Sequence, residues 1–154
     1  MKEYEYSFKV NSLKKCIDYC KQNNYKLIEN TKQSRTLYKN SSKIMARVTI
    51  NDKEKILDFK EDNLSAEILK IRKESLPLKF DDIKAVESIL DILEYQKYIT
   101  LIRTRIVYEK DNVKFELDEY ESPEKYCVVA IEGKKEEVDK IYQDIEVIYE
   151  NNND

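Results

Sequence analysis

The chain has 154 residues, of which 41% are hydrophobic and 38% are charged, so it is long enough to fold as one globular domain with a substantial core. Its 28 basic and 31 acidic residues give a formal net charge of −3, which requires neither a nucleic acid nor a membrane surface as a partner. The absence of histidine excludes Ser-His-Asp and Cys-His nucleophiles and histidine-based zinc sites, and a single glycine excludes a glycine-rich phosphate-binding loop.

The first part of the chain predicts a strand, a helix and a second strand. Residues 3–10 alternate between polar and apolar side chains, with the period of a strand. Cys16 and Cys20 then fall on the apolar face of a helix, so we expect them to be buried thiols. Residues 26–39 are rich in Thr, Leu, Ile and Tyr and predict a long strand.

The middle of the chain predicts a hairpin, another strand and a second helix. Residues 43–51 and 55–60 are expected to form the hairpin, and residues 66–76 a further strand. Either Asp81 or Asp82 is expected to cap the helix that follows. The core-facing residues of this helix are expected to be Ile83, Val86, Ile89, Leu90 and Leu93.

The last part of the chain predicts three strands and a third helix. The strands are expected at residues 98–109, 113–119 and 126–132, joined by short turns. We expect residues 1–150 to form a single domain and residues 151–154 a polar tail. About eight strands joined mainly by short turns predict an α+β fold in which a closed, eight-stranded antiparallel β-barrel carries the helices on its outside.

The sequence also predicts a compartment and a class of partner. The first ten residues contain no apolar run of a signal peptide, and no stretch approaches the roughly 20 apolar residues of a membrane span. The three cysteines are an odd number and have no histidine beside them, which favours a reducing compartment. We therefore expect a cytoplasmic monomer or homodimer whose partner is a small molecule.

Charged residues share faces of the predicted strands, because residues two apart in a strand point to the same side. Such faces are either the solvated side of an ordinary sheet or, if the helices cover the outside of a barrel, its interior. A charged interior needs internal ion pairs or a ligand; arginine and lysine suit phosphates, and clustered carboxylates suit Mg²⁺ or Mn²⁺. The residues on these faces are Glu3, Glu5, Arg47, Lys60, Arg72, Arg103, Arg105, Glu116 and Asp118.

In order and spacing these residues resemble the CYTH superfamily, or triphosphate tunnel metalloenzymes, which includes class IV adenylyl cyclases, thiamine triphosphatases and inorganic triphosphatases. The resemblance extends from residue 3 to residue 145 and rests on KEYEYSFKV, MARVTI, ILDFK, KIRKES, TLIRTRIVYE, FELDEY and AIEG. It implies that Mg²⁺ or Mn²⁺ is held by Glu3, Glu5, Glu116, Asp118 and Glu132. It also implies that a triphosphate is bound by Arg47, Lys60, Arg72, Arg103 and Arg105.

The sequence departs from the pattern of this family at four positions, one of which is Leu76 in place of a common acidic residue. Ser7 replaces a lysine associated with catalysis, Thr49 replaces an arginine, and Ala130 replaces a glutamate. Lys9 lies on the same strand face as Ser7, and the resemblance thus gives as catalytic residues Glu3, Glu5 and Lys9. The favoured function is metal-dependent hydrolysis of an inorganic, nucleoside or thiamine triphosphate. A class IV adenylyl cyclase and a non-catalytic module that binds nucleotides or polyphosphate are the alternatives.

Overall fold

The computed structural model describes residues 2–62 and 69–150, with side chains described for residues 4–62 and 73–150. Within these ranges the elements are, in chain order, β1 (Lys2–Val10), α1 (Lys14–Gln22), β2 (Lys26–Lys39), β3 (Ile44–Ile50), β4 (Lys55–Glu61), β5 (Leu69–Lys73), β6 (Leu78–Lys79), α2 (Ile83–Ile92), β7 (Gln96–Lys110), β8 (Val113–Ser122), β9 (Tyr126–Gly133) and α3 (Lys135–Glu150). The predicted order of strands and helices is confirmed, and β6 is the one element that was not expected. Of the strand expected at residues 66–76, the first three residues lie outside the described ranges.

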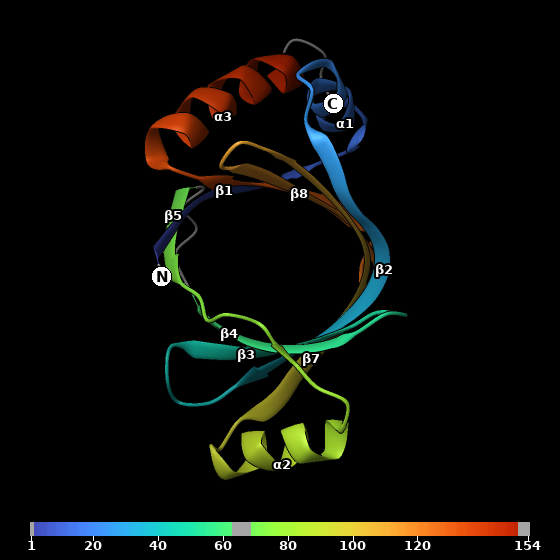
Figure 1. Ribbon diagram of the computed structural model, residues 1–154, viewed down its shortest axis with the longest axis vertical. Helices are drawn as coiled ribbons and strands as arrows, with labels where there is room; N and C mark the ends of the chain where they lie inside the picture. Colours follow the sequence, from blue (N-terminus) through green and yellow to red (C-terminus); the bar gives the residue numbers. More distant parts are fainter. Residues whose placement is uncertain (1, 63–68, 151–154) are drawn as a thin grey trace.

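The strands form one antiparallel sheet that curves around a central axis. In the described ranges its nine strands follow the order β5-β1-β9-β8-β7-β2-β3-β4-β6. Figure 1 shows α1 and α3 outside this sheet on one side and α2 outside it on the opposite side. The predicted α+β fold, with an antiparallel sheet and helices packed on its outer face, is therefore confirmed.

The curved sheet is not closed by a continuous pair of strands. Its hydrogen-bonded order ends at β5 on one side and at β6 on the other. Where β4 and the end of β5 meet, Lys60 and Glu74 form an isolated bridge, and the backbone N of Ser75 donates a hydrogen bond to the carbonyl oxygen of Phe59 at 2.9 Å. The structure thus supports a curved sheet of eight longer strands and the two-residue β6, and a closed barrel is not confirmed.

Apolar residues on the outer face of β8 and β9 form a core beneath α1 and α3. Phe115 lies at its centre and is fully buried, in edge-to-face contact with Tyr25 at 5.1 Å between ring centroids. Cys16 and Cys20 of α1 are buried in this core, as expected. Burial raises the pKa of the Cys16 thiol to about 11, so this thiol is unreactive at neutral pH.

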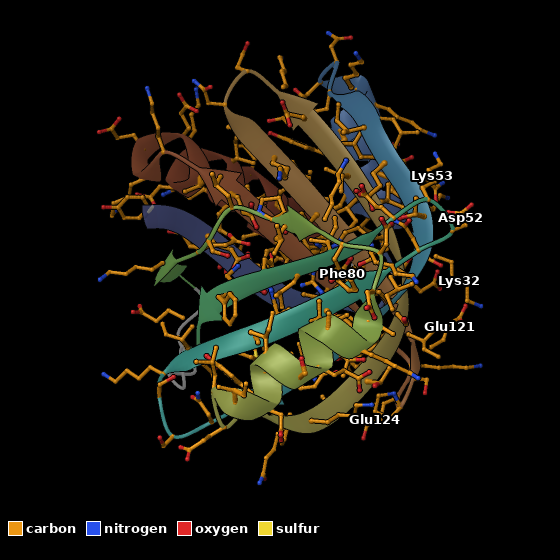
Figure 2. All side chains as sticks on the ribbon, turned by 60° about the horizontal axis from the view of Figure 1, so that its bottom comes forward. Lys32, Asp52, Lys53, Phe80, Glu121 and Glu124 are labelled. Atoms are coloured by element: carbon orange, nitrogen blue, oxygen red, sulfur yellow. The ribbon has the colours of Figure 1, made fainter. Side chains whose placement is uncertain are left out.

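A second core lies between α2 and the outer face of β3 and β4. Val86 and Leu90 of α2 are buried there, and Phe80, on the segment before the helix, packs against the same cluster (Figure 2). The prediction for Ile89 and Leu93 was wrong, because their side chains are 52% and 49% exposed. A short helix on a curved surface touches it along a narrow stripe, and the spacing of four between Val86 and Leu90 follows that stripe.

The two cores lie on the outer face of the sheet, so the alternate residues of the same strands point inward. In this arrangement the charged faces of the strands line the inside of the curved sheet. No helix in the described ranges is long and apolar enough to cross a membrane.

Asp82, one of the two expected caps, caps α2. Its Oδ1 accepts hydrogen bonds from the backbone N of Lys84 at 3.0 Å and of Ala85 at 3.3 Å. The neighbouring Asp81 instead offers its backbone carbonyl to Nζ of Lys55. We expect Asp82→Ala to lower the free energy of unfolding by about 1 kcal/mol, and Asp81→Ala to change it by less than about 0.5 kcal/mol. Urea denaturation measures both, and equal losses would contradict the assignment.

Candidate functional site

The inward faces of the strands line a cavity of about 430 Å³. Its walls come from β1, β2, β3, β4, β7, β8 and β9, so residues far apart in the sequence meet in one space. The structure brings together here most of the residues singled out from the sequence, namely Glu5, Arg47, Lys60, Arg103, Arg105, Glu116 and Asp118. These side chains are therefore interior groups and not the solvated face of an open sheet.

The remaining predicted residues lie elsewhere or outside the described side chains. Glu132 is 6% exposed and contributes to a carboxylate cluster beside the cavity. Lys9 is exposed, does not line the cavity and places its ammonium 4.7 Å from the ring centroid of Tyr126. The side chains of Glu3 and Arg72 lie outside the described ones, although the backbones of these two residues are paired between β1 and β5.

Sequence reasoning did not place several charged and polar residues that line the cavity. The strand period could have found them, since each lies two or four residues from another inward residue or directly across from one. These residues are Gln33, Arg35, Asp58, Lys114 and Tyr120.

Three buried or half-buried carboxylates form a group that we call the carboxylate cluster: Glu5 of β1, Glu116 of β8 and Glu132 of β9. One carboxylate oxygen of each lies within 4.8 Å of the others. Burial by itself raises the pKa of Glu116, but the charge of Arg105 and the hydrogen bond with Glu132 hold it well below its ordinary value. Three carboxylates this close fit one hard divalent cation that completes its coordination with water.

Three arginines follow one another along the cavity wall, and we call them the arginine ladder: Arg105, Arg103 and Arg35. The pairing of β2 with β7 puts Arg105 opposite Thr31 and Arg103 opposite Gln33, while Arg35 lies two residues further along β2. Arg105 donates a hydrogen bond to Glu116 and is therefore the arginine of the ladder nearest to the carboxylate cluster. Arg35 is the step farthest from it.

Arg105 is fully engaged by carboxylates. Its Nε and Nη2 donate to the two oxygens of Asp118, both at 2.8 Å, and its Nη1 donates to Glu116 Oε2 at 2.9 Å. Burial alone would lower the pKa of Arg105, but the two carboxylates raise it well above its ordinary value. Asp118, which the resemblance assigns to metal, is therefore an arginine partner in this structure.

Arg103 is engaged mainly by neutral groups. Its Nε donates to Gln33 Oε1 at 2.9 Å and its Nη1 to the Tyr120 hydroxyl at 2.8 Å, while Asp118 Oδ2 lies 3.3 Å from Nη1. The side chain is 2% exposed, and burial, followed by the charge of Arg105, lowers its pKa. Compensation by carboxylate charge thus decreases from Arg105 to Arg103.

On the opposite wall, Arg47 and Lys60 share one carboxylate. Arg47 donates to both oxygens of Asp58, at 2.8 and 2.5 Å, and to Glu74 Oε1 at 2.6 Å. The ammonium of Lys60 lies 3.9 Å from Glu74 Oε2 and 3.7 Å from Glu5 Oε1. Lys60 therefore connects the Arg47 ion pairs to the carboxylate cluster.

Two of the departures from the expected motif pattern face each other across paired strands. Ser7 of β1 is directly paired with Ala130 of β9, and both line the cavity. Thr49 of β3 is directly paired with Arg35 of β2, whose Nε donates to the threonine hydroxyl at 3.0 Å. A guanidinium thus lies beside Thr49, although it comes from the neighbouring strand.

No protein-family model and no curated protein matches this sequence. Among solved structures, the chain is similar to the PH1012 protein of Pyrococcus horikoshii, with 21% identity over 93% of this chain and 87% of that one and a TM-score of 0.74. It is also similar to a "putative adenylate cyclase" of Bacillus halodurans (16% identity, 97% and 91% covered, TM-score 0.61). A third match is a chain of the Schizosaccharomyces pombe Mediator head module (9% identity, 97% and 93% covered, TM-score 0.61).

These similarities show the fold, and they confirm at that level the resemblance drawn from the sequence. The Bacillus and Schizosaccharomyces chains are equally similar to this one in TM-score. A fold shared by such different proteins does not decide between an enzyme and another role, so function has to be argued from the cavity.

Glu116 is expected to make stability depend on acid pH. Its pKa is held low in the folded protein, whereas an unfolded glutamate has a pKa of about 4.3. The stabilisation is therefore complete above about pH 4.3 and is lost as the pH falls toward the folded pKa. We expect Glu116→Gln to make the free energy of unfolding fall less steeply between about pH 5 and pH 3.

Urea denaturation at a series of pH values measures this slope. Glu124→Gln is the matched control, because Glu124 is exposed in the turn between β8 and β9 (Figure 2). The control should keep the slope of the wild type. A Glu116→Gln slope equal to that of the wild type would show that Arg105 does not hold this carboxyl ionised.

Proposed function

We propose that this protein is a metal-dependent hydrolase of a triphosphate-bearing substrate. The observation that carries the proposal is the adjacency of the carboxylate cluster and the arginine ladder, joined by the hydrogen bond from Arg105 to Glu116. A chain of phosphates needs both kinds of group, since arginine forks bind its oxygens and carboxylates hold the divalent cation that accompanies it.

Each part of the cavity has a role in such a reaction. Mg²⁺ or Mn²⁺ held by Glu5, Glu116 and Glu132 would supply Lewis-acid polarisation of a phosphoryl oxygen and a bound water of lowered pKa. Arg103, Arg105 and the opposite cations Arg47 and Lys60 bind the phosphate oxygens and neutralise the charge that develops on them. Because the chain has no histidine, the carboxylates are the groups that orient the attacking water.

A non-catalytic polyphosphate-binding module is the second candidate, and one observation favours it. Ser7 and Ala130 face each other in the cavity, where the sequence resemblance leads us to expect a lysine and a glutamate. The short side chains remove one cation and one carboxylate from the same place, while the arginine ladder remains. Such a cavity keeps the arginines that bind phosphate but has fewer charged groups that could take part in hydrolysis.

Product analysis separates these functions. The purified protein is incubated with tripolyphosphate, ATP or thiamine triphosphate in the presence of Mg²⁺ or Mn²⁺, and all products are identified. Release of phosphate or pyrophosphate by hydrolysis is the expected result. Cyclic AMP with pyrophosphate would identify a class IV adenylyl cyclase instead, and binding without turnover would identify the binding module. The absence of both binding and turnover would overturn the proposal.

Glu5→Gln is expected to abolish turnover and to keep substrate binding. The change preserves the size of the side chain but removes one negative charge from the carboxylate cluster. We expect turnover to fall by about 100-fold or more, because even the outer-shell partners of metal ligands contribute about 10- to 100-fold to metal affinity or activity. Metal-free binding of tripolyphosphate should stay the same or tighten, because a negative charge has left the site. Steady-state kinetics and titration calorimetry measure the two effects.

Glu54→Gln provides the control for this variant. Glu54 also lines the cavity, but it pairs with Lys79 at 3.1 Å and does not belong to the carboxylate cluster. It should retain turnover within a few-fold of the wild type. Equal losses in both variants would mean that Glu5 has no special relation to the metal.

A further inference from the structure

Arg35 differs from the other arginines of the cavity in its partners. Arg47 and Arg105 each bind two carboxylates, and Arg103 has one within 3.3 Å. The guanidinium of Arg35 makes its one hydrogen bond with a described residue from Nε to Thr49 Oγ1, at 3.0 Å. Within the described side chains no carboxylate forms an ion pair with it. Among the described side chains, Arg35 is therefore the cavity arginine without a carboxylate ion pair.

The surroundings of Arg35 are cationic. Burial lowers the pKa of its guanidinium, and the charges of Arg103, Arg47 and Arg105 lower it further, while the charge of Asp58 opposes this only in part. A desolvated cation among other cations destabilises the ligand-free protein, because repulsion adds to the loss of hydration. Such a group is expected where a ligand of opposite charge restores the balance.

The neighbouring step of the arginine ladder also has unused hydrogen-bonding capacity. Arg103 is 2% exposed, yet its Nη2 has no hydrogen-bond partner within the described side chains. Buried donors of charged groups are almost always satisfied, so an orphan donor requires an explanation. Two successive steps, Arg103 and Arg35, thus present guanidinium donors that no carboxylate fully uses.

The position of Arg35 fixes which part of a ligand it can reach. The strand advances about 6.6 Å for every two residues, and Arg35 is the step of the ladder farthest from the carboxylate cluster. A ligand that is anchored at the cluster and also reaches Arg35 must be an extended chain of anionic groups. A short anion can contact one end of the ladder only.

We infer that Arg35 and Arg103 form an anion subsite for the phosphate group farthest from the carboxylate cluster, through which the cavity selects a chain of three phosphates over a chain of two. This inference rests on the proposed function and deepens it. Arg35 is a binding residue in this account: it contacts the distal phosphate and takes no part in the chemistry at the other end. Thr49 holds its guanidinium in place from the paired strand.

The test is titration calorimetry with tripolyphosphate and with pyrophosphate in the presence of Mg²⁺, which anchors either chain at the carboxylate cluster, under conditions in which product analysis finds no turnover. We expect Arg35→Gln to weaken the binding of tripolyphosphate by about 10- to 100-fold, the loss of one charge-assisted contact, and to leave pyrophosphate binding within about twofold. The ratio of the two affinities should therefore shrink in the variant. Equal weakening of both ligands, or weakening of neither, would overturn the inference.

A stability measurement distinguishes a binding role from a structural one. Because no carboxylate among the described side chains forms an ion pair with Arg35, Arg35→Gln should keep or raise the melting temperature of the ligand-free protein. Arg47→Gln should lower it, since Asp58 and Glu74 would lose their partner. A fall in melting temperature for Arg35→Gln that matches the fall for Arg47→Gln would assign Arg35 to structure and overturn the inference.

A swap of the paired residues provides a rescue. Arg35 and Thr49 lie directly opposite each other on β2 and β3, so the double variant Arg35→Thr, Thr49→Arg places the guanidinium at the same level of the cavity. It should recover most of the preference for tripolyphosphate that Arg35→Gln loses, and failure of a folded swap to do so would count against the subsite.

The outcomes separate this inference from the proposed function. If the wild type binds neither phosphate chain, both fail. If it binds tripolyphosphate in an Arg35-dependent way but never turns a triphosphate over, the hydrolase fails and the subsite stands. If turnover is observed and Arg35→Gln changes neither affinity, the subsite fails and the hydrolase stands.

Discussion

The structure depends on the compensation of charge inside a curved sheet. Its outer face packs against three helices, so the inner face must carry the polar residues of the same strands. Buried charges are tolerated only when they are paired. Here Arg105 of β7 is held by Glu116 and Asp118 of the neighbouring β8, and Arg47 of β3 is held by Asp58 of the neighbouring β4 and by Glu74, which follows β5. These ion pairs allow a sheet of this shape to have a charged interior.

The same ion pairs explain how the cavity could receive a polyanion. Phosphate oxygens offer arginine the same bidentate geometry as carboxylates, so a triphosphate, if it binds here as proposed, would replace internal partners without changing the orientation of the guanidinium groups. Arg105 forms two carboxylate ion pairs and Arg103 one, whereas Arg35 forms none among the described side chains and is compensated only in part, by the charge of Asp58. The cavity is thus most nearly neutral beside the carboxylate cluster and most positive at its far end.

Much of this arrangement could be predicted because strand period is a local signal. The alternation around Arg103 and Arg105, with apolar residues between them, was sufficient to assign their face. Arg35 was missed because the residues two positions before and after it in the strand, Gln33 and Leu37, are uncharged, and its contact with Thr49 depends on the pairing of β2 with β3. Lys9 does not line the cavity, although its paired residue Val128 does, because its ammonium lies over the ring of Tyr126, a contact that the sequence does not signal. Whether the sheet closes also depends on contacts between residues far apart in the sequence, so local patterns could not predict it.

A crystal structure of the protein with Mn²⁺ and tripolyphosphate tests the central claim most directly, since the anomalous signal locates the metal independently of the phosphate density. The account predicts one Mn²⁺ within coordination distance of Glu5, Glu116 and Glu132, and a phosphate chain that extends from it along Arg105 and Arg103 to Arg35. Metal and phosphate bound on the outer surface, or a cavity that contains neither at saturating ligand, would contradict it.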